Sequence, residues 1–397
     1  MITTINNKHN KLNVPNLRFP EFQGEWEKCK LGDLCNVLMC KRILASQTNT
    51  EEGVPFYKIG TIGNAPDAYI SKELFDDYKT KYNYPHKGEV MITCAGTVGK
   101  CVIYDGKDAY YQDSNIVWID NPSQCISNSF LYHLLAKVDW RKLNSTTIIR
   151  IYNDDLRNLK LSYPQIEEQQ KISRLLSFLD ERIVTQNKII EDLKKLKSAI
   201  IDYAINSLDT DFAKFGSLYE MAGEGGTPTT SNASFYDNGK IPFIKIDDLK
   251  QKYLTENKDF ITELGLQKSS AWLVPTHSIL FSNGATIGEI SITTYPVCTK
   301  QGILGIVPKQ NIDVEFLYYF MSSSYFKKAV SRIVTEGTMK TAYLKDINNI
   351  LCPIPTKEKQ QEIAKMPSTL NSKIDFEQSI LKLFCSQKQY LLRQMFI

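Results

Sequence analysis

The stretch from Glu167 to Asn206 constrains the fold of this chain more than any other segment. It contains no Gly or Pro, and its apolar residues recur at steps of three, four and seven, as in a helix that buries one stripe against another helix. The helix would be about 60 Å long at 1.5 Å per residue. The stripe comprises Ile172, Leu176, Leu179, Ile183, Ile190, Leu193, Ile200 and Ala204, with polar Gln186 and Lys197 at the two remaining positions. Such a stripe needs a partner.

The composition is that of an ordinary globular protein, with 42% hydrophobic and 23% charged residues, and 397 residues suggest two or three domains. The net charge of +4 allows a nucleic-acid partner without arguing for one. A polar N-terminus and the absence of a membrane-length apolar run predict a cytoplasmic protein. The nine cysteines, without CxxC spacing, and four scattered histidines predict reduced thiols and no metal site.

The motifs that precede the long stretch return after it in the same order. The matched segments are CKLGDL with AKFGSL, VPFYKI with IPFIKI, CAGTVG with NGATIG, FLYHLL with FLYYFM, DDLRNLKLSYP with KDINNILCPIP, and IEEQQKI with KEKQQEI. Gly216 follows Gly32 by 184 residues and Pro355 follows Pro164 by 191, a drift that small loop insertions produce. Two unrelated strand-rich domains are the alternative, but six matches in order favour a duplication.

The duplication predicts a second long helix near the C-terminus, antiparallel to the first, although each helix could instead pair with another molecule. Its stripe would comprise Ile363, Leu370, Ile374, Leu381, Phe384, Leu391 and Met395, with Glu377 and Lys388 aligned to Gln186 and Lys197. Pro367 replaces Leu176. Because proline removes a donor and clashes with the preceding turn, we expect this helix to break near Pro367 and restart at about Ser368 or Leu370.

These patterns predict an α+β fold with approximate two-fold symmetry, in which two long antiparallel helices separate two duplicated mixed α/β domains. The expected segments are a flexible tail at 1–14, a domain at 15–164, a central helix at 165–208, a second domain at 209–355 and a C-terminal helix at 356–397.

The sequence contains no recognisable catalytic motif, so we expect a binding protein and not an enzyme. The run Gly96–Lys100 resembles a phosphate loop, but the pattern GxxxxGK[ST] is incomplete, and Glu289 replaces Lys100 in the second copy. We therefore predict a tight structural turn, with a loop that approaches a nucleic-acid backbone as the alternative.

Two similar but non-identical domains suit duplex DNA, whose half-sites on one face recur about every 34 Å. Each domain would contact phosphates for affinity and base edges for sequence through its polar loops. In the first domain the candidates are Lys41, Arg42, Lys58, Thr97, Lys100, Gln112, Ser114, Asn115, Thr146, Thr147 and Arg150. In the second they are Thr227, Thr229, Thr230, Lys245, Asn283, Thr286, Lys300, Gln301, Thr338, Lys340 and Tyr343. For any single candidate, an ordinary solvated loop residue is the alternative.

Over essentially its whole length the chain resembles the specificity subunit of type I restriction–modification systems. The resemblance rests on the duplicated domains and on two junctions, LSYPQIEEQQKI at Leu161–Ile172 and CPIPTKEKQQEI at Cys352–Ile363. These junctions are similar to the family's Pro-x-x-x-E-Q-type start of each spacer helix. The opening segment Asn13–Leu34 also looks like the family's N-terminal lead.

The resemblance implies that each domain is a target-recognition domain reading one half of a bipartite, asymmetric DNA site. The helices would set the gap and carry two methyltransferase subunits, which bind S-adenosylmethionine and methylate a flipped adenine. Translocase–nuclease subunits that use ATP and Mg would join for cleavage, and none of these cofactors would lie on this chain. Because Lys359 stands where Glu168 does, the two junctions are expected to engage partners unequally. A non-DNA coiled-coil scaffold and, more weakly, an enzyme with an unrecognised site are the alternatives.

Overall fold

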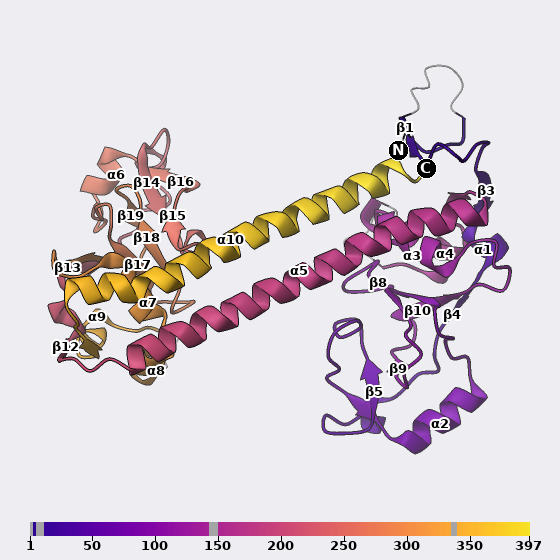
Figure 1. The fold of residues 1–397 in the computed structure, drawn as a ribbon, viewed down its shortest axis with the longest axis horizontal. Coiled ribbons are helices and arrows are strands. Elements are labelled where there is room, and N and C mark those ends of the chain that lie inside the picture. The colour runs from indigo at the N-terminus through magenta and orange to yellow at the C-terminus, as the bar shows by residue number, and fades with distance from the viewer. Residues whose placement is uncertain (1–2, 5–11, 143–149, 335–339) are drawn as a thin grey trace. The chain divides into compact units, whose positions relative to one another are not determined.

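The computed structural model describes residues 3–4, 12–142, 150–334 and 340–397 (Figure 1). The chain divides into two compact units, one of residues 1–186 and 380–397 and the other of residues 187–379. Each unit contains one mixed α/β domain and parts of two long helices, α5 (Ile166–Asn206) and α10 (Lys357–Gln394). Among the described residues, no helix has the length and apolar character needed to cross a membrane.

The domain of the first unit is built on a four-stranded antiparallel sheet in the order β4-β10-β7-β8. Its strands are β4 (Asn36–Leu38), β10 (Ile116–Asp120), β7 (Val90–Thr93) and β8 (Cys101–Ile103). A three-stranded sheet contains β6 (Tyr69–Ile70), β5 (Val54–Tyr57) and β9 (Tyr110–Tyr111), and short pairs join β1 (Thr3–Thr4) to β2 (Leu17–Arg18) and β3 (Glu27–Lys30) to β11 (Lys160–Tyr163). The α-helices of the domain are α1 (Leu31–Leu34), α2 (Lys72–Lys81), α3 (Asn128–Lys137) and α4 (Asn153–Arg157).

The domain of the second unit has a five-stranded sheet in the order β13-β20-β17-β18-β15. Its strands are β13 (Tyr219–Glu224), β20 (Ile303–Pro308), β17 (Ile279–Ser282), β18 (Ile290–Thr293) and β15 (Tyr253–Leu254). A three-stranded sheet contains β16 (Asp259–Ile261), β14 (Ile241–Ile244) and β19 (Cys298–Thr299), and β12 (Phe212–Lys214) pairs with β21 (Leu351–Pro353). The α-helices of the domain are α6 (Glu263–Gln267), α7 (Val314–Ser322), α8 (Ser324–Ile333) and α9 (Leu344–Ile347).

The two domains share one topology except for the additional edge strand β15 of the second, which confirms the predicted duplication. In each three-stranded sheet the central strand has one antiparallel and one parallel neighbour: β5 lies between β6 and β9, and β14 lies between β16 and β19. Strands β7 and β17 are buried along their whole length, as their near-continuous apolar sequences require. Helices α3 and α7 both start at a capping side chain, since Ser127 accepts from Phe130 N and Asp313 accepts from Phe316 N.

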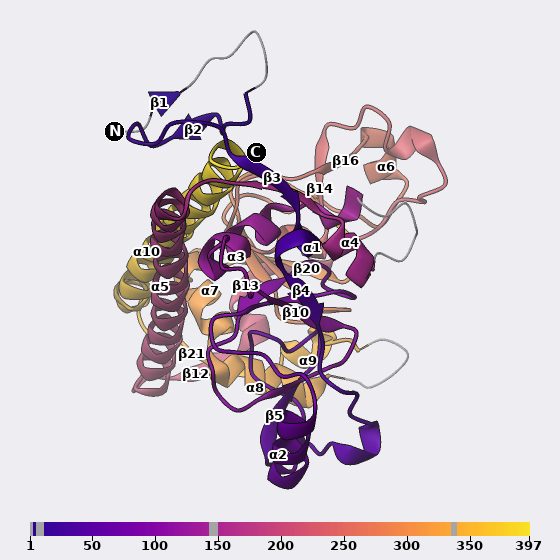
Figure 2. The ribbon, with the colours of Figure 1, turned by 90° about the vertical axis from the view of Figure 1, so that its right-hand side faces the viewer.

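Within each unit, the segments of α5 and α10 run side by side (Figures 1 and 2) and pair antiparallel, which confirms the predicted fold class. The Lys388 amine contacts the Asp180 carboxylate in the first unit, and Lys197 Nζ donates to Asn371 Oδ1 over 2.9 Å in the second. Lys388 aligns with Lys197, and Asn371 aligns with Asp180, so the duplication repeats this contact. All fifteen predicted apolar stripe residues are buried or half-buried: Ile172, Leu176, Leu179, Ile183, Ile190, Leu193, Ile200, Ala204, Ile363, Leu370, Ile374, Leu381, Phe384, Leu391 and Met395.

The predicted break near Pro367 is wrong, because α10 is continuous from Lys357 to Gln394 with Pro367 inside it. An interior proline costs about 3 kcal/mol, and the packing of this turn offsets that cost. Pro367 is itself buried. The next residue, Ser368, is hydrogen-bonded through its hydroxyl to Lys252 Nζ at 3.1 Å and to Tyr319 Oη at 3.2 Å. Tertiary contacts therefore override the local preference of the sequence.

The predicted flexible tail at 1–14 needs correction where the structure describes it. Asn13 is buried, and its Nδ2 donates to Trp26 O at 2.5 Å while Trp26 N donates to Asn13 O at 2.8 Å. Thr3 and Thr4 pair antiparallel with Arg18 and Leu17. The first domain therefore includes residues that were expected to lie outside it.

Candidate nucleic-acid interface

The Gly-rich runs of both copies form the same hairpin turn, between β7 and β8 and between β17 and β18. In the first, Lys100 N donates to Thr93 Oγ1 at 3.0 Å and Gly99 N donates to Thr93 O at 2.8 Å. In the second, Glu289 N donates to Ser282 Oγ at 2.8 Å and Gly288 N to Ser282 O at 3.0 Å. The turns thus use these backbone donors internally, which supports a tight structural turn over a phosphate loop.

One residue in each turn joins two further loops through its backbone. Cys94 N donates to Asn115 O at 2.7 Å, and Ile151 N donates to Cys94 O at 2.8 Å. In the second domain, Asn283 N donates to Gly302 O at 3.0 Å, and Ala342 N donates to Asn283 O at 2.9 Å. The hairpin turn, the loop before β10 or β20, and the segment before α4 or α9 therefore meet at equivalent places in the two domains.

Side chains bring two more loops into the same group in the first domain. Thr97 Oγ1 donates to Ile59 O at 3.2 Å, and Lys100 Nζ donates to Ile62 O at 2.5 Å. Arg42 Nε donates to Asp113 Oδ2 at 2.8 Å. The "first loop cluster" therefore comprises residues 41–42, 58–62, 94–100, 112–115 and 150–152.

The second domain assembles its loops in the corresponding way. Gln301 N donates to Thr227 Oγ1 at 3.3 Å, and Lys300 N donates to Ile244 O at 2.9 Å. The "second loop cluster" comprises residues 225–230, 244–248, 283–289, 300–302 and 340–343. Each cluster therefore collects the polar loops that the sequence scatters over more than 100 residues.

The structure divides the candidate residues by exposure. Those that are exposed are Lys41, Arg42, Thr97, Thr229, Thr230, Lys245, Thr286, Lys300, Gln301, Lys340 and Tyr343. Those that are half-buried are Lys58, Lys100, Gln112, Ser114, Asn115, Arg150 and Thr227. Asn283 is 1% exposed and its Nδ2 donates to Ala342 O at 3.3 Å, so its side chain lies inside the cluster and not at the surface. Thr146, Thr147 and Thr338 lie outside the described residues.

Several of the candidate cations already contact carboxylates. Besides the pair of Arg42 with Asp113, Lys58 Nζ lies 3.2 Å from Asp67 Oδ1, and Lys245 Nζ lies 2.8 Å from Asp259 Oδ1. Exposed ion pairs contribute about 0–1 kcal/mol each. Breaking the two exposed lysine pairs therefore costs little, so Lys58 and Lys245 remain available to an anionic ligand.

One aromatic position was missed by the reasoning from sequence. Tyr152 is 61% exposed and immediately precedes α4, just as Tyr343, which is 48% exposed, immediately precedes α9. A cation lies near each ring, with the Arg150 guanidinium 5.9 Å and Lys345 Nζ 5.5 Å from the ring centres. The alignment of DDLRNLKLSYP with KDINNILCPIP, extended by two residues, would have identified Tyr152 as the counterpart of Tyr343. Exposed aromatic rings can stack on nucleic-acid bases.

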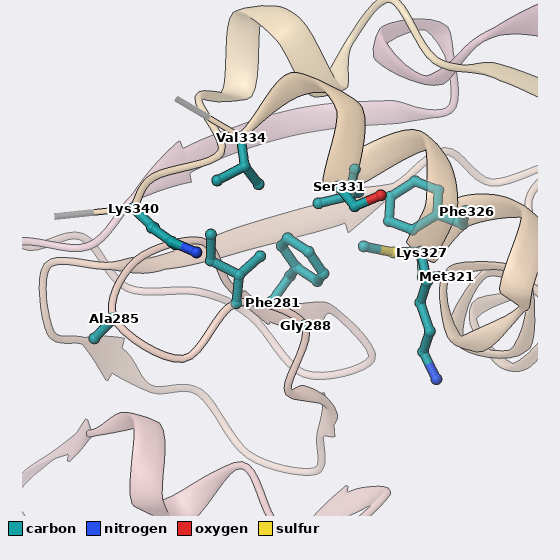
Figure 3. A pocket seen from close by; sticks show the side chains of 11 residues that line it. Phe281, Ala285, Gly288, Met321, Phe326, Lys327, Ser331, Val334 and Lys340 are labelled. Atoms are coloured by element: carbon teal, nitrogen blue, oxygen red, sulfur yellow. The ribbon is translucent and has the colours of Figure 1, made fainter. Parts of the chain in front are cut away.

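A pocket of about 480 Å³ lies beside the second loop cluster (Figure 3). Phe281, Met321 and Phe326 form much of its wall, and Figure 3 shows Lys340 extending toward it while the amine of Lys327 points away. None of the described residues that line the pocket is acidic or a histidine. Among the described residues there is also no group of three or more His, Cys, Asp or Glu that could hold a metal ion. The pocket offers a binding surface and no pair of acid and base groups.

Each junction between a domain and a long helix is held by one glutamine. Gln169 Nε2 donates to Pro164 O and to Cys125 O, both at 2.8 Å, and Ser127 N donates to Gln169 Oε1 at 2.7 Å. Gln360 repeats this pattern with Pro355 O, Asn311 O and Asp313 N in the second unit. The glutamine therefore fixes the first turn of α5 or α10 to the loop that begins α3 or α7.

Glu168, beside this glutamine, has an internal role. Arg18 Nε and Nη2 donate to its two carboxylate oxygens at 2.8 and 2.7 Å, and the two side chains are 6% and 2% exposed. Lys359, at the aligned position, is exposed and lies 2.9 Å from Glu362. Glu168 is therefore engaged inside the protein whereas Lys359 is at the surface, and unequal engagement of partners by the two junctions stays a prediction.

Comparisons with known proteins identify relatives for both copies. The family described as "Type I restriction modification DNA specificity domain" matches residues 23–195 and again 209–383. The putative type I restriction enzyme MjaX specificity subunit of Methanocaldococcus jannaschii is 23% identical over 389 residues, which cover 90% of this chain and 89% of that protein. The putative specificity subunit S.HindORF215P of Haemophilus influenzae is 49% identical over 164 residues, but these span only 41% of this chain and 42% of that protein.

Solved structures show the same fold. The S subunit of the type I restriction–modification system from M. genitalium is 18% identical, with a TM-score of 0.59 and coverage of 97% of this chain and 99% of that one. A chain from a study of complex assembly and conformational transition of the type I R-M system is 16% identical, with a TM-score of 0.56 and coverage of 92% and 96%. At these identities the likeness concerns the fold.

Proposed function

Because this chain belongs to the family of type I restriction–modification DNA specificity subunits, we propose that its two domains read the two halves of a bipartite, asymmetric DNA site. Subunits of this family are non-catalytic, and the catalytic activities reside in other subunits of the complex. The chain would thus supply DNA recognition to an assembly that includes methyltransferase and restriction subunits. S-adenosylmethionine, ATP and Mg would bind those partners.

The observation that carries this proposal is the pair of loop clusters, which are built alike and differ in their side chains. The backbone bonds of Cys94 and Asn283 hold each cluster in the same arrangement. The surface chemistry then differs, because Lys41 and Arg42 of the first cluster correspond in topology to a loop with Thr229 and Thr230 in the second. Similar geometry with different donors and acceptors suits two half-sites of different sequence.

We propose that the paired helices set the distance between the half-sites and carry two methyltransferase subunits. The polar contacts of Lys388 with Asp180 and of Lys197 with Asn371 support a defined register. A slip of α5 against α10 would place these lysines against apolar seam residues, and an unpaired buried charge is costly. The helices can then act as a spacer of fixed length.

The test is DNA binding by the chain assembled with its modification subunit, measured on a library that varies each base of the two half-sites. The double variant Lys41→Ala/Arg42→Ala should lose discrimination at bases of one half-site. A variant at another loop of the second cluster, Lys300→Ala/Gln301→Ala, should do so at the other half-site. Each lost base contact should reduce discrimination by about 1–3 kcal/mol. A uniform loss over both halves from either variant would contradict the assignment of one half-site to each domain.

A further inference from the structure

An N-terminal segment covers the first junction, and no described residues cover the second junction in the same way. We call residues 16–24 the lead segment. Arg18 forms its buried pair with Glu168, and Glu21 forms an ion pair with Lys171. The Lys171 amine also lies 4.6 Å from the ring centre of Phe19. The lead segment therefore covers the first turns of α5 with an alternation of apolar and charged contacts.

Apolar packing accompanies these charged contacts. Leu17 and Phe19 pack against the core of the first unit, together with Leu175 of α5 and Leu392 of α10. Leu175 is half-buried. The lead segment thus shields an apolar surface at this junction from water.

The aligned surface of the second unit is an open groove of about 650 Å³. Residues Lys359, Glu362 and Met366 of α10 line it, and they align with Glu168, Lys171 and Leu175 of α5. The groove is also lined by Ile200, Tyr203 and Ile363. Tyr203 is 76% exposed and Met366 is 60% exposed, so both of these large side chains face water. A segment bound in the groove would bury them.

The charges of the groove are reversed relative to the first junction. A lysine, Lys359, stands where Glu168 binds Arg18, and a glutamate, Glu362, stands where Lys171 binds Glu21. Lys359 Nζ and Glu362 Oε2 contact each other at 2.9 Å, and both side chains are exposed. Since exposed pairs are weak, a ligand with matching charges can separate this pair and contact both members.

We propose that this groove binds an extended segment of another protein. That segment would be apolar, as the lead segment is, with an acidic residue in place of Arg18 and a basic residue in place of Glu21. A second copy of this chain does not fit, because its lead segment would bring Arg18 to Lys359 and Glu21 to Glu362, so that like charges meet. The reversal therefore selects a partner with a different sequence, and this inference does not depend on DNA recognition.

The test uses two labelled peptides and the full chain, with binding followed by fluorescence anisotropy. One peptide is the lead segment itself, NLRFPEFQG, and the other carries Arg18→Glu and Glu21→Lys. The charge-reversed peptide should bind at least about tenfold more tightly than the native peptide, because two like-charge contacts become attractive. The chain variant Lys359→Glu/Glu362→Lys keeps the surface pair in reversed order, so it should fold normally and prefer the native peptide.

Two further variants locate the site. Tyr203→Ser/Met366→Ser should abolish binding of the charge-reversed peptide, whereas Phe178→Ser, at another exposed aromatic residue of α5, should leave it unchanged. The proposal is overturned if neither peptide binds, or if both bind equally to the unaltered chain. Preferential binding of the native peptide would overturn it as well and would point to a second copy of this chain as the occupant.

Discussion

The buried pair of Arg18 and Glu168 allows a sharp test of how the first junction is held together. Arg18→Met removes both charge-assisted hydrogen bonds, at 2.8 and 2.7 Å, and leaves Glu168, which is 1% exposed, without its partner. Breaking a buried pair from one side costs about 3–5 kcal/mol, since the remaining charge is desolvated and uncompensated. We expect the free energy of local opening of the lead segment and of the first turn of α5 to fall by that amount.

Two variants serve as controls for this prediction. Lys359→Met alters the aligned position of the second junction, where the side chain is 50% exposed, and should cost less than about 1 kcal/mol. Arg18→Met/Glu168→Met removes both charges and keeps similar volume, so it should recover the part of the loss that comes from the unpaired carboxylate. The bonds from Arg18 to Gln23 O and Gly24 O stay lost in both variants. The contrast between the single and double variants isolates the cost of the unpaired carboxylate.

The measurement is hydrogen exchange of peptides that cover residues 12–26 and 166–176. Local exchange is preferable to global denaturation because a chain with two compact units need not unfold in one step. A loss of 3 kcal/mol corresponds to exchange that is faster by about a hundredfold or more. The reasoning is refuted if Arg18→Met leaves exchange as it is in Lys359→Met, or if the double variant exchanges as fast as the single one.

Three other outcomes follow from the structure. Burial lowers the pKa of His133 from 6.5 to about 4. Because the unfolded chain then binds a proton more readily, the first unit should lose roughly 3 kcal/mol of stability as the pH drops from 6.5 through 4. His133→Phe should flatten this dependence, as measured by hydrogen exchange of the first unit. Tyr152→Ala and Tyr343→Ala should each weaken binding by about 1–3 kcal/mol, measured on DNA with one altered half-site, and each should act on a different half. Lys388→Met should destabilise its unit by about 1 kcal/mol, because an ion pair is lost. Lys197→Met should cost its unit less, because only a bond to a neutral amide is lost and burial already lowers the pKa of Lys197. Hydrogen exchange of each unit measures both changes.

Repetition made the architecture predictable from the sequence. Six matched segments in the same order placed equivalent strands and helices in both domains, and the heptad steps of α5 located its buried face. Both patterns are local or periodic, so they can be recognised in the sequence without knowledge of contacts between distant residues. The prediction of a break at Pro367 is wrong for the opposite reason. The helix there is held by contacts of Ser368 with Lys252 and Tyr319, which come from a distant part of the chain.

The candidate interface was predictable as a set of loops and less so as a set of side chains. Composition identified polar loops, and the structure brings them together through the backbone of Cys94 and Asn283. Whether a polar side chain faces water depends on neighbours far along the chain, which is why Asn283 proved to be buried. Polarity and charge do not single out Tyr152, but the repeat aligns it with Tyr343.

Glu168 shows a related limit. The junction motif predicts that Glu168 lies at the start of the helix, but it does not predict which residue the side chain of Glu168 contacts. Its partner Arg18 lies 150 residues earlier. Nothing in the spacing of the two residues predicts their contact, and only the fold reveals that this carboxylate is internal while Lys359 is at the surface.

The central claim, that paired helices set the gap between two half-sites, is tested most directly by shortening both helices together. Deleting residues 184–190 of α5 and the aligned residues 375–381 of α10 removes one heptad from each and retains the contacts of Lys388 with Asp180 and of Lys197 with Asn371. The measurement is the map of methylated adenines in cells that express the variant with its modification subunits. One heptad spans about 10 Å, so the account predicts the same two half-sites with a gap shorter by up to about three base pairs at 3.4 Å each. Methylation of the original site with its gap unchanged would contradict it.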